Sequence, residues 1–325
     1  MTRTKVVAFG GGHGLSASLR ALRHCAPELD LDITAVVTVG DDGGSSGRLR
    51  AERDALPPGD LRQALVALAG DHPATRLSAN LLQHRFSAGR PGGAGADSLA
   101  GHAVGNLLLC GLMELLGDPV AALDHAAAML GAVGRVLPMS CEPVGIEARV
   151  RGVLPDRPDE VRVVRGQHQV AVTSGQVESL RLVPVDPSAC PEAVTAVGEA
   201  DWLIFGPGSW YTSVIPHLLV PELAEAIVSS PARRLVTLNL AAEKETLGLS
   251  VADHLAALRW YLPELKIDLV LGDGKAVGEP EPVERAAESL GARLVLAPVA
   301  VLDGTPRHDP VALGAALVPV LGANR

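Results

Sequence analysis

Glycine-rich loops that follow buried strands are the parts of this chain best suited to chemistry, because such loops can hold phosphate groups. The segment GGGHGLSA begins at Gly10, directly after an apolar run, and leads into a helical pattern. Small residues permit a tight turn there, and free backbone amides at the positive end of a helix dipole favour an anion. A tight turn without a ligand is the alternative. We expect a phosphate or diphosphate to contact Gly11, Gly12, His13, Gly14 and Leu15.

An acidic loop, TVGDDGGSSGRLR at residues 38–50, follows the second apolar run. Carboxylates at the carboxyl end of a strand, here Asp41 and Asp42, suit ribose hydroxyls or a divalent cation. The glycines and hydroxyls after them suit an anion, with an arginine supplying charge-assisted hydrogen bonds. The candidates for that anion contact are Ser45, Ser46 and Arg48, with Arg50 as the alternative arginine. A solvated turn capped by Asp42 is the alternative.

Two further segments carry polar residues at predicted helix starts. In PPGDLRQAL, Asp60 suits a helix cap better than a ligand contact, while Arg62 can reach the site from the first turn. In GHAVGNL, His102 and Asn106 suit either a ligand or buried backbone groups. All four are candidate site residues.

A second glycine loop, FGPGSWYTS at residues 205–213, also follows a strand. Its hydroxyls can donate to phosphate oxygens at a helix start, and the alternative is a Pro/Gly turn with Ser209 as helix cap. The candidates are Gly206, Gly208, Ser209, Thr212 and Ser213. Weaker candidates are Asn239 and Glu243 to Thr246 after the next strand, and Arg307, His308 and Asp309 before the last helix, where Asp309 suits a helix cap. The chain has no Walker or HExxH motif and no metal-spaced His/Cys set, and we assign neither catalytic residues nor metal ligands.

A parallel sheet would bring these loops together, because the carboxyl ends of its strands lie at one edge. Strands are predicted at 6–9, 33–39, 202–205, 235–239, 268–271 and 294–297, with helical patterns between them. Short alternating segments at 146–150, 161–164, 169–173 and 180–185 predict an antiparallel, β-rich insertion at about 133–187. We expect an α/β fold, a Rossmann-like doubly wound and mostly parallel sheet, in a single domain over residues 1–325.

Composition excludes several classes of function. The chain has 325 residues and 37 acidic against 28 basic side chains, and its net charge of −9 opposes binding to nucleic acid. The four cysteines are far apart and form no CxxC pair, which predicts reduced thiols. No apolar run approaches the roughly 18 residues of a membrane span, and no signal-peptide core follows the amino terminus. We expect a cytoplasmic protein.

The motifs together resemble the gluconeogenesis factor family, the YvcK-type proteins related to 2-phospho-L-lactate transferase (CofD-like). They occur in the family's order over nearly the whole chain, ending with RHDP from Arg307. The resemblance implies a UDP-sugar, UDP-N-acetylglucosamine, held at the mouth of the sheet, no catalysis and no cofactor. It also implies a role in cell shape and cell-wall precursor supply during gluconeogenic growth. Gly12 and Gly14 would accommodate the diphosphate, Asp41 and Asp42 the hydroxyls or base, and Arg307 the bound anion. We further expect a homo-oligomer with protein partners still to be identified.

Two alternatives from other classes remain open. A phospholactyl-type transferase would use Mg²⁺ at Asp41 or Asp42, but the GGTGG loop and lysine of those transferases are absent here. A nicotinamide dehydrogenase is disfavoured because Asp41 lies 27 positions after Gly14, later than the roughly 20 expected. The chain also departs from the family at His13, where threonine is usual, at residues 241–249, and at Pro310, which replaces a phosphorylatable threonine of some relatives.

Overall fold

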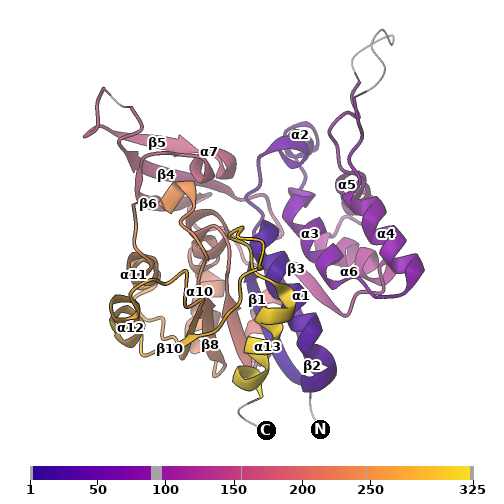
Figure 1. The fold of residues 1–325 in the computed structure, drawn as a ribbon. Helices are drawn as coiled ribbons and strands as arrows, with labels where there is room; N and C mark the ends of the chain where they lie inside the picture. The colour runs from indigo at the N-terminus through magenta and orange to yellow at the C-terminus, as the bar shows by residue number, and fades with distance from the viewer. Residues whose placement is uncertain (1–2, 89–96, 155, 247, 323–325) are drawn as a thin grey trace.

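A seven-stranded parallel sheet forms the centre of the molecule (Figure 1). The computed structural model describes residues 3–88, 97–154, 156–246 and 248–322. The sheet order is β10-β9-β8-β7-β1-β2-β3, and every pairing is parallel. Its strands are β1 (Thr4–Gly10), β2 (Leu31–Val37), β3 (Gly134–Pro138), β7 (Trp202–Phe205), β8 (Arg233–Thr237), β9 (Leu269–Gly272) and β10 (Arg293–Leu296). The predicted α/β class and doubly wound sheet are confirmed.

The strand order reverses between β1 and β7, which are hydrogen-bonded neighbours although about 190 residues apart in sequence. Ligands of open α/β sheets bind at such a point, outside the carboxyl ends of the strands. The two strands are apolar and buried because helices cover both faces of the sheet (Figure 1). The Phe9 and Phe205 rings stack with centroids 4.8 Å apart, which fixes the two strands at the ends from which both glycine loops leave.

The helices that matter most for the site are α1, which packs on α13 and α3, and α2 and α5, which pack on α3. The helices are α1 (Gly12–Leu29), α2 (Gly44–Arg53), α3 (Pro58–Leu68), α4 (Pro73–Gln83), α5 (Val104–Leu116), α6 (Pro119–Met129), α7 (Gln167–Ala171), α8 (Pro191–Glu199), the π-helix η1 (Trp210–Val214), α9 (Ile215–Leu218), α10 (Pro221–Ser229), the 3-10 helix η2 (Lys244–Thr246), α11 (Val251–Tyr261), α12 (Pro280–Ser289) and α13 (Pro310–Leu321). No helix in the described ranges is long and apolar enough to cross a membrane.

The β-rich region differs from its prediction in two ways. A small antiparallel sheet, β5-β4-β6, contains β4 (Gly145–Arg151), β5 (Val161–Arg165) and β6 (Gln176–Val183), but β3 pairs with β2 in the main sheet. The antiparallel part therefore begins near 145 rather than 133. The strand predicted at 169–173 is wrong, because that stretch lies mostly in helix α7, whose backbone Asp42 caps through the His168 N–H at 2.8 Å.

Candidate functional site

The first glycine loop joins β1 to α1 at the point where the strand order reverses. Gly12 has a φ of +56°, in the left-handed region that favours glycine. A Cβ on Gly14 would lie 2.3 Å from the Pro207 carbonyl oxygen and 2.5 Å from the Cα of Gly208. Only glycine fits at position 14, because the second glycine loop packs directly against the start of α1.

The second glycine loop leaves β7 and is held from β8. Asn239 accepts a hydrogen bond from the Gly208 N–H at 2.9 Å and donates one to the Gly208 carbonyl at 2.9 Å. On the other side, Ser18 of α1 donates to the Gly206 carbonyl at 2.9 Å. The loop is thus fixed between α1 and the end of β8.

A pocket of about 650 Å³ opens between these loops and the segment before α13. Among the predicted residues, its lining includes Gly11, Gly12, His13, Gly14, Gly208, Ser209, Ser213, Asn239 and Arg307. Arg20, Glu243 and His308 also line it. Glu243 and His308 belong to the segments that the sequence analysis gave as weaker candidates, whereas Arg20 was not selected. Arg307 is exposed and forms an ion pair with Asp303 at 2.8 Å. Backbone amides and two arginines give the pocket the donors that a diphosphate requires.

Asp60 lies buried beneath the first glycine loop. Thr38 donates to its carboxylate at 3.3 Å, and the Gly12 N–H also hydrogen-bonds it. Burial, followed by the nearby charge of Asp41, raises the pKa of Asp60 to about 7. The predicted capping role is wrong, because α3 begins after Pro57 without a side-chain cap. Asp60 instead connects the glycine loop to a buried polar cluster.

That buried polar cluster joins α2, α3 and α5. Ser45 Oγ lies 2.9 Å from His102 Nδ1, and Asn106 donates to Ser45 at 3.0 Å and to Ser46 at 3.3 Å. Arg62 is also buried, at 3% exposure. Its Nε and Nη1, together with Asn106 Oδ1, have no hydrogen-bond partner within the described residues. Unpartnered buried groups of this kind require water or a ligand.

Asp41 lies at the edge of this cluster, near Asp60, since Asp41 is among the charges that raise the Asp60 pKa. Its Oδ1 accepts from the Gly43 N–H at 3.0 Å. Asp42 points elsewhere, to the backbone of α7. The two adjacent carboxylates therefore do not form a joint pair for Mg²⁺, and no group of three or more His, Cys, Asp or Glu side chains in the described part of the chain could hold a metal.

Several predicted residues have structural positions outside the pocket lining. Leu15 is in the core at 1% exposure, and Arg48 donates to the Ala100 carbonyl at 2.8 Å. Gly206 turns the chain with a φ of +74°, and Thr212 is buried against Ser209. Glu245 belongs to the segment 243–246, which the sequence analysis gave as a weaker candidate. It lies behind Ser209, a contact that no local pattern indicates because it depends on the tertiary fold.

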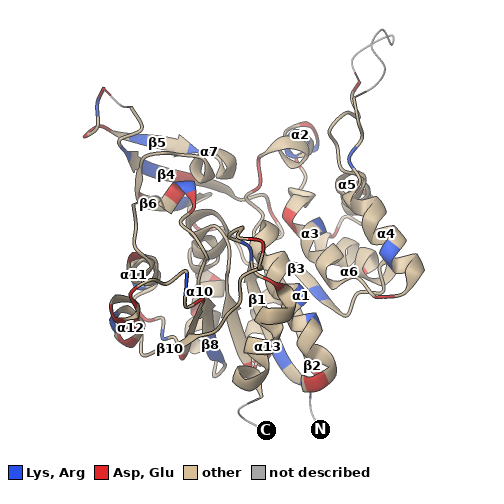
Figure 2. Ribbon diagram, viewed as in Figure 1, with Lys and Arg blue, Asp and Glu red and all other residues tan. Residues whose placement is uncertain are grey.

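Basic positions of the small sheet lie apart from this pocket. Figure 2 shows Lys and Arg positions along β4 and β5. Arg165 and Arg181 both pair with Glu147, at 2.9 and 2.5 Å, and Arg151 pairs with Glu178. Carboxylates neutralise these arginines, and none of the residues of the two glycine loops lies beside them in the cavity of the small sheet, so that sheet is a weaker anion site than the glycine loops.

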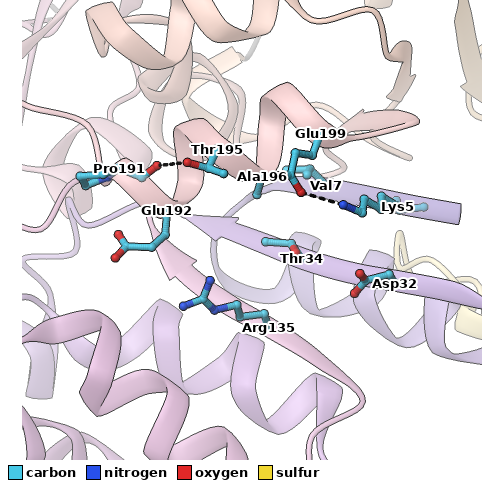
Figure 3. Close-up of a pocket in the computed structure, with 11 residues that line it drawn as sticks. Lys5, Val7, Asp32, Thr34, Arg135, Pro191, Glu192, Thr195, Ala196 and Glu199 are labelled. Carbon is cyan, nitrogen blue, oxygen red and sulfur yellow. Dashed lines mark hydrogen bonds and ion pairs between the residues drawn. The ribbon is translucent and has the colours of Figure 1, made fainter. Parts of the chain in front are cut away.

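A second cavity, of about 450 Å³, lies between α8 and strands β1 to β3 (Figure 3). Its cations are already paired: Lys5 contacts Glu199 at 2.7 Å and Arg135 contacts Asp124 at 2.7 Å. None of the predicted site residues lines it. We therefore place the candidate site at the glycine loops.

Comparisons with known proteins agree on one group of relatives. The family model of 2-phospho-L-lactate transferase CofD matches residues 6–294. A Mycobacterium tuberculosis protein provisionally named gluconeogenesis factor is 52% identical over 316 residues, covering 96% of this chain and 89% of the relative. The gluconeogenesis factor of Bacillus subtilis is 37% identical, covering 90% of this chain and 85% of the relative. A crystal structure of a UPF0052 family protein from Bacillus halodurans superposes with a TM-score of 0.83 at 34% identity, covering 98% of this chain and 99% of the other.

Proposed function

This chain belongs to the 2-phospho-L-lactate transferase (CofD) family and to the gluconeogenesis factors, and we propose that it binds a UDP-sugar, UDP-N-acetylglucosamine, without transforming it. The observation that carries the proposal is the pocket between the two glycine loops at the reversal of strand order. In its biological role, the protein would adjust cell shape and cell-wall precursor supply during gluconeogenic growth, in the cytoplasm. Assembly into a homo-oligomer with further protein partners stays a prediction.

The lining and the volume of the pocket suit a nucleotide sugar. The start of α1 suits the diphosphate, because the helix dipole and the backbone N–H groups other than that of Gly12, which contacts Asp60, favour negative charge there. Arg307 can add charge-assisted hydrogen bonds. A volume of about 650 Å³ is in the range of small-molecule sites, which supports a ligand of nucleotide-sugar size.

Calorimetry with UDP-N-acetylglucosamine tests the proposal. We expect Arg307→Met to lower the affinity about 10-fold or more, because charge-assisted hydrogen bonds contribute about 1.5–3 kcal/mol. Arg149→Met, at an exposed position of β4, is the matched control and should leave the affinity unchanged. NAD and GDP serve as competing ligands. Binding of NAD but not of UDP-N-acetylglucosamine would overturn the proposal.

A transferase is the second candidate, and the family match favours it specifically. Asp41, close to Asp60 below the glycine loop, is the carboxylate that could serve Mg²⁺ in that case. Incubation with Mg²⁺, a phospholactyl nucleotide and a deazaflavin acceptor distinguishes the two candidates. Turnover there would replace the non-catalytic proposal.

A further inference from the structure

Ser209 connects the pocket to a buried carboxylate. It lines the pocket next to Gly208, and its hydroxyl donates to Glu245 Oε1 at 2.5 Å. Glu245 lies in η2 and is only 2% exposed. The Tyr211 N–H donates to the same Oε1 at 2.9 Å, which fixes the carboxylate oxygen that faces Ser209. The Ser209 hydrogen is therefore directed away from the pocket.

The remaining hydrogen-bonding capacity of Ser209 can be counted. A serine hydroxyl has one hydrogen to donate and two lone pairs that accept. The hydrogen goes to Glu245, so the Thr212 hydroxyl, which contacts the same oxygen, must be the donor in that contact. One lone pair is left for the pocket. A lone pair facing a phosphate oxygen is repulsive, whereas a ligand O–H or N–H is a suitable partner.

Glu243 also lines the cavity and is its acidic residue nearest in sequence to Glu245. Asn239 favours neither donors nor acceptors on the ligand, because Gly208 takes one of its two amide hydrogens and one of the two lone pairs of its oxygen. The donors lie in other parts of the lining, on the first glycine loop and on Arg20 and Arg307. The pocket is thus polarised between a part rich in donors and a part rich in acceptors.

We propose that Ser209, oriented by Glu245, acts only as an acceptor toward the ligand and selects a sugar group that donates a hydrogen bond, a hydroxyl or the acetamido N–H. The proposal rests on the proposed binding of a UDP-sugar. It differs from the sequence expectation that Ser209 donates to phosphate. Glu245 is the positioning residue and Ser209 the specificity residue.

The protonation state of Glu245 determines the pH at which the test must be done. Burial raises the pKa of Glu245 to about 7, with Glu243 adding to the shift and the hydrogen bond from Ser209 opposing it. The titratable groups around it are Glu243 in the same loop and Tyr211 of η1, whose own pKa is raised. Measurements at pH 8.5 therefore keep Glu245 ionised.

The experiment compares UDP-N-acetylglucosamine with analogues that each lack one donor. These are the 3-, 4- and 6-deoxyfluoro sugars and the 2-O-acetyl ester, which has no N–H. By calorimetry, we expect one analogue to bind the wild-type protein about 10-fold more weakly than the parent, the equivalent of about 1.4 kcal/mol. Ser209→Ala should abolish that difference. Ser229→Ala, at the exposed end of α10 and outside the pocket lining, is the matched control and should retain it.

Variants at Glu245 test whether this residue orients the Ser209 hydroxyl or only supports the fold. Glu245→Leu frees the Ser209 hydrogen and should abolish the preference, whereas Glu245→Gln keeps an oxygen acceptor and should restore it. If the leucine variant fails to fold, Ser209→Ala still decides. Equal binding of all analogues, or a preference that survives Ser209→Ala, would overturn this inference. Absence of any UDP-N-acetylglucosamine binding would instead refute the proposed function.

Discussion

Replacing Asp60 by asparagine should remove part of the pH dependence of stability. Burial raises the pKa of Asp60 from 3.8 to about 7, so the folded protein holds this proton more tightly than the unfolded chain does. The resulting stability is fully present below pH 4 and is lost as the pH rises to about 7. Between pH 5 and pH 8 the pKa of about 7 corresponds to a loss of roughly 2.5 kcal/mol. An asparagine side chain at this position would keep the shape of the carboxyl group but would not titrate.

Urea unfolding followed by circular dichroism at pH 5 and pH 8 measures this difference. The wild-type free energy of unfolding should fall by about 2.5 kcal/mol more than that of Asp60→Asn over the interval. Asp54→Asn, at an exposed left-handed position that suits asparagine, is the control and should follow the wild type. Equal slopes for Asp60→Asn and the wild type would show that Asp60 is already ionised in the folded protein at pH 5.

Further predictions concern ligand affinity and packing. UDP-N-acetylglucosamine affinity should fall as the pH rises through 7, because ionised Asp60 beneath the Gly12 amide repels a diphosphate, and Asp60→Asn should weaken this dependence in calorimetry. Gly14→Ala should lower the free energy of unfolding by about 1–3 kcal/mol, since its Cβ would meet the Pro207 carbonyl. Gly111→Ala, with open space around it in α5, should instead be neutral or stabilising by up to about 1 kcal/mol; a loss as large as that of Gly14→Ala would contradict the steric account.

The sequence predicted the elements that local patterns encode. The strand at 202–205 has the bounds that the structure shows, because four apolar residues lie between an acidic residue and a glycine turn. Both glycine loops were located for the same reason, and parallel strands bring their carboxyl ends to one edge of the sheet. The positions of these loops can therefore be predicted from the sequence once the strands are taken to be parallel.

Side-chain partners were less predictable, because they depend on tertiary contacts. Asp42 was expected at the ligand, yet it caps α7, a helix about 125 residues later that alternation alone had suggested was a strand. Asp60 had the spacing of a helix cap, but the fold buries it under the first glycine loop. Glu245 was only a weaker candidate from its place after a strand, and no local pattern indicated its contact with Ser209. Each of these roles follows from which distant segment packs against the residue.

The direct packing of Gly14 against Pro207 and Gly208, with Asn239 holding the loop from behind, also bears on how fast a ligand associates. A site whose walls are preorganised pays little ordering entropy when it is filled. The ligand would then bind without a change in the conformation of the site, and its association rate constant would be nearly insensitive to small changes in the sugar. Differences among related sugars should appear as residence times, in the dissociation step.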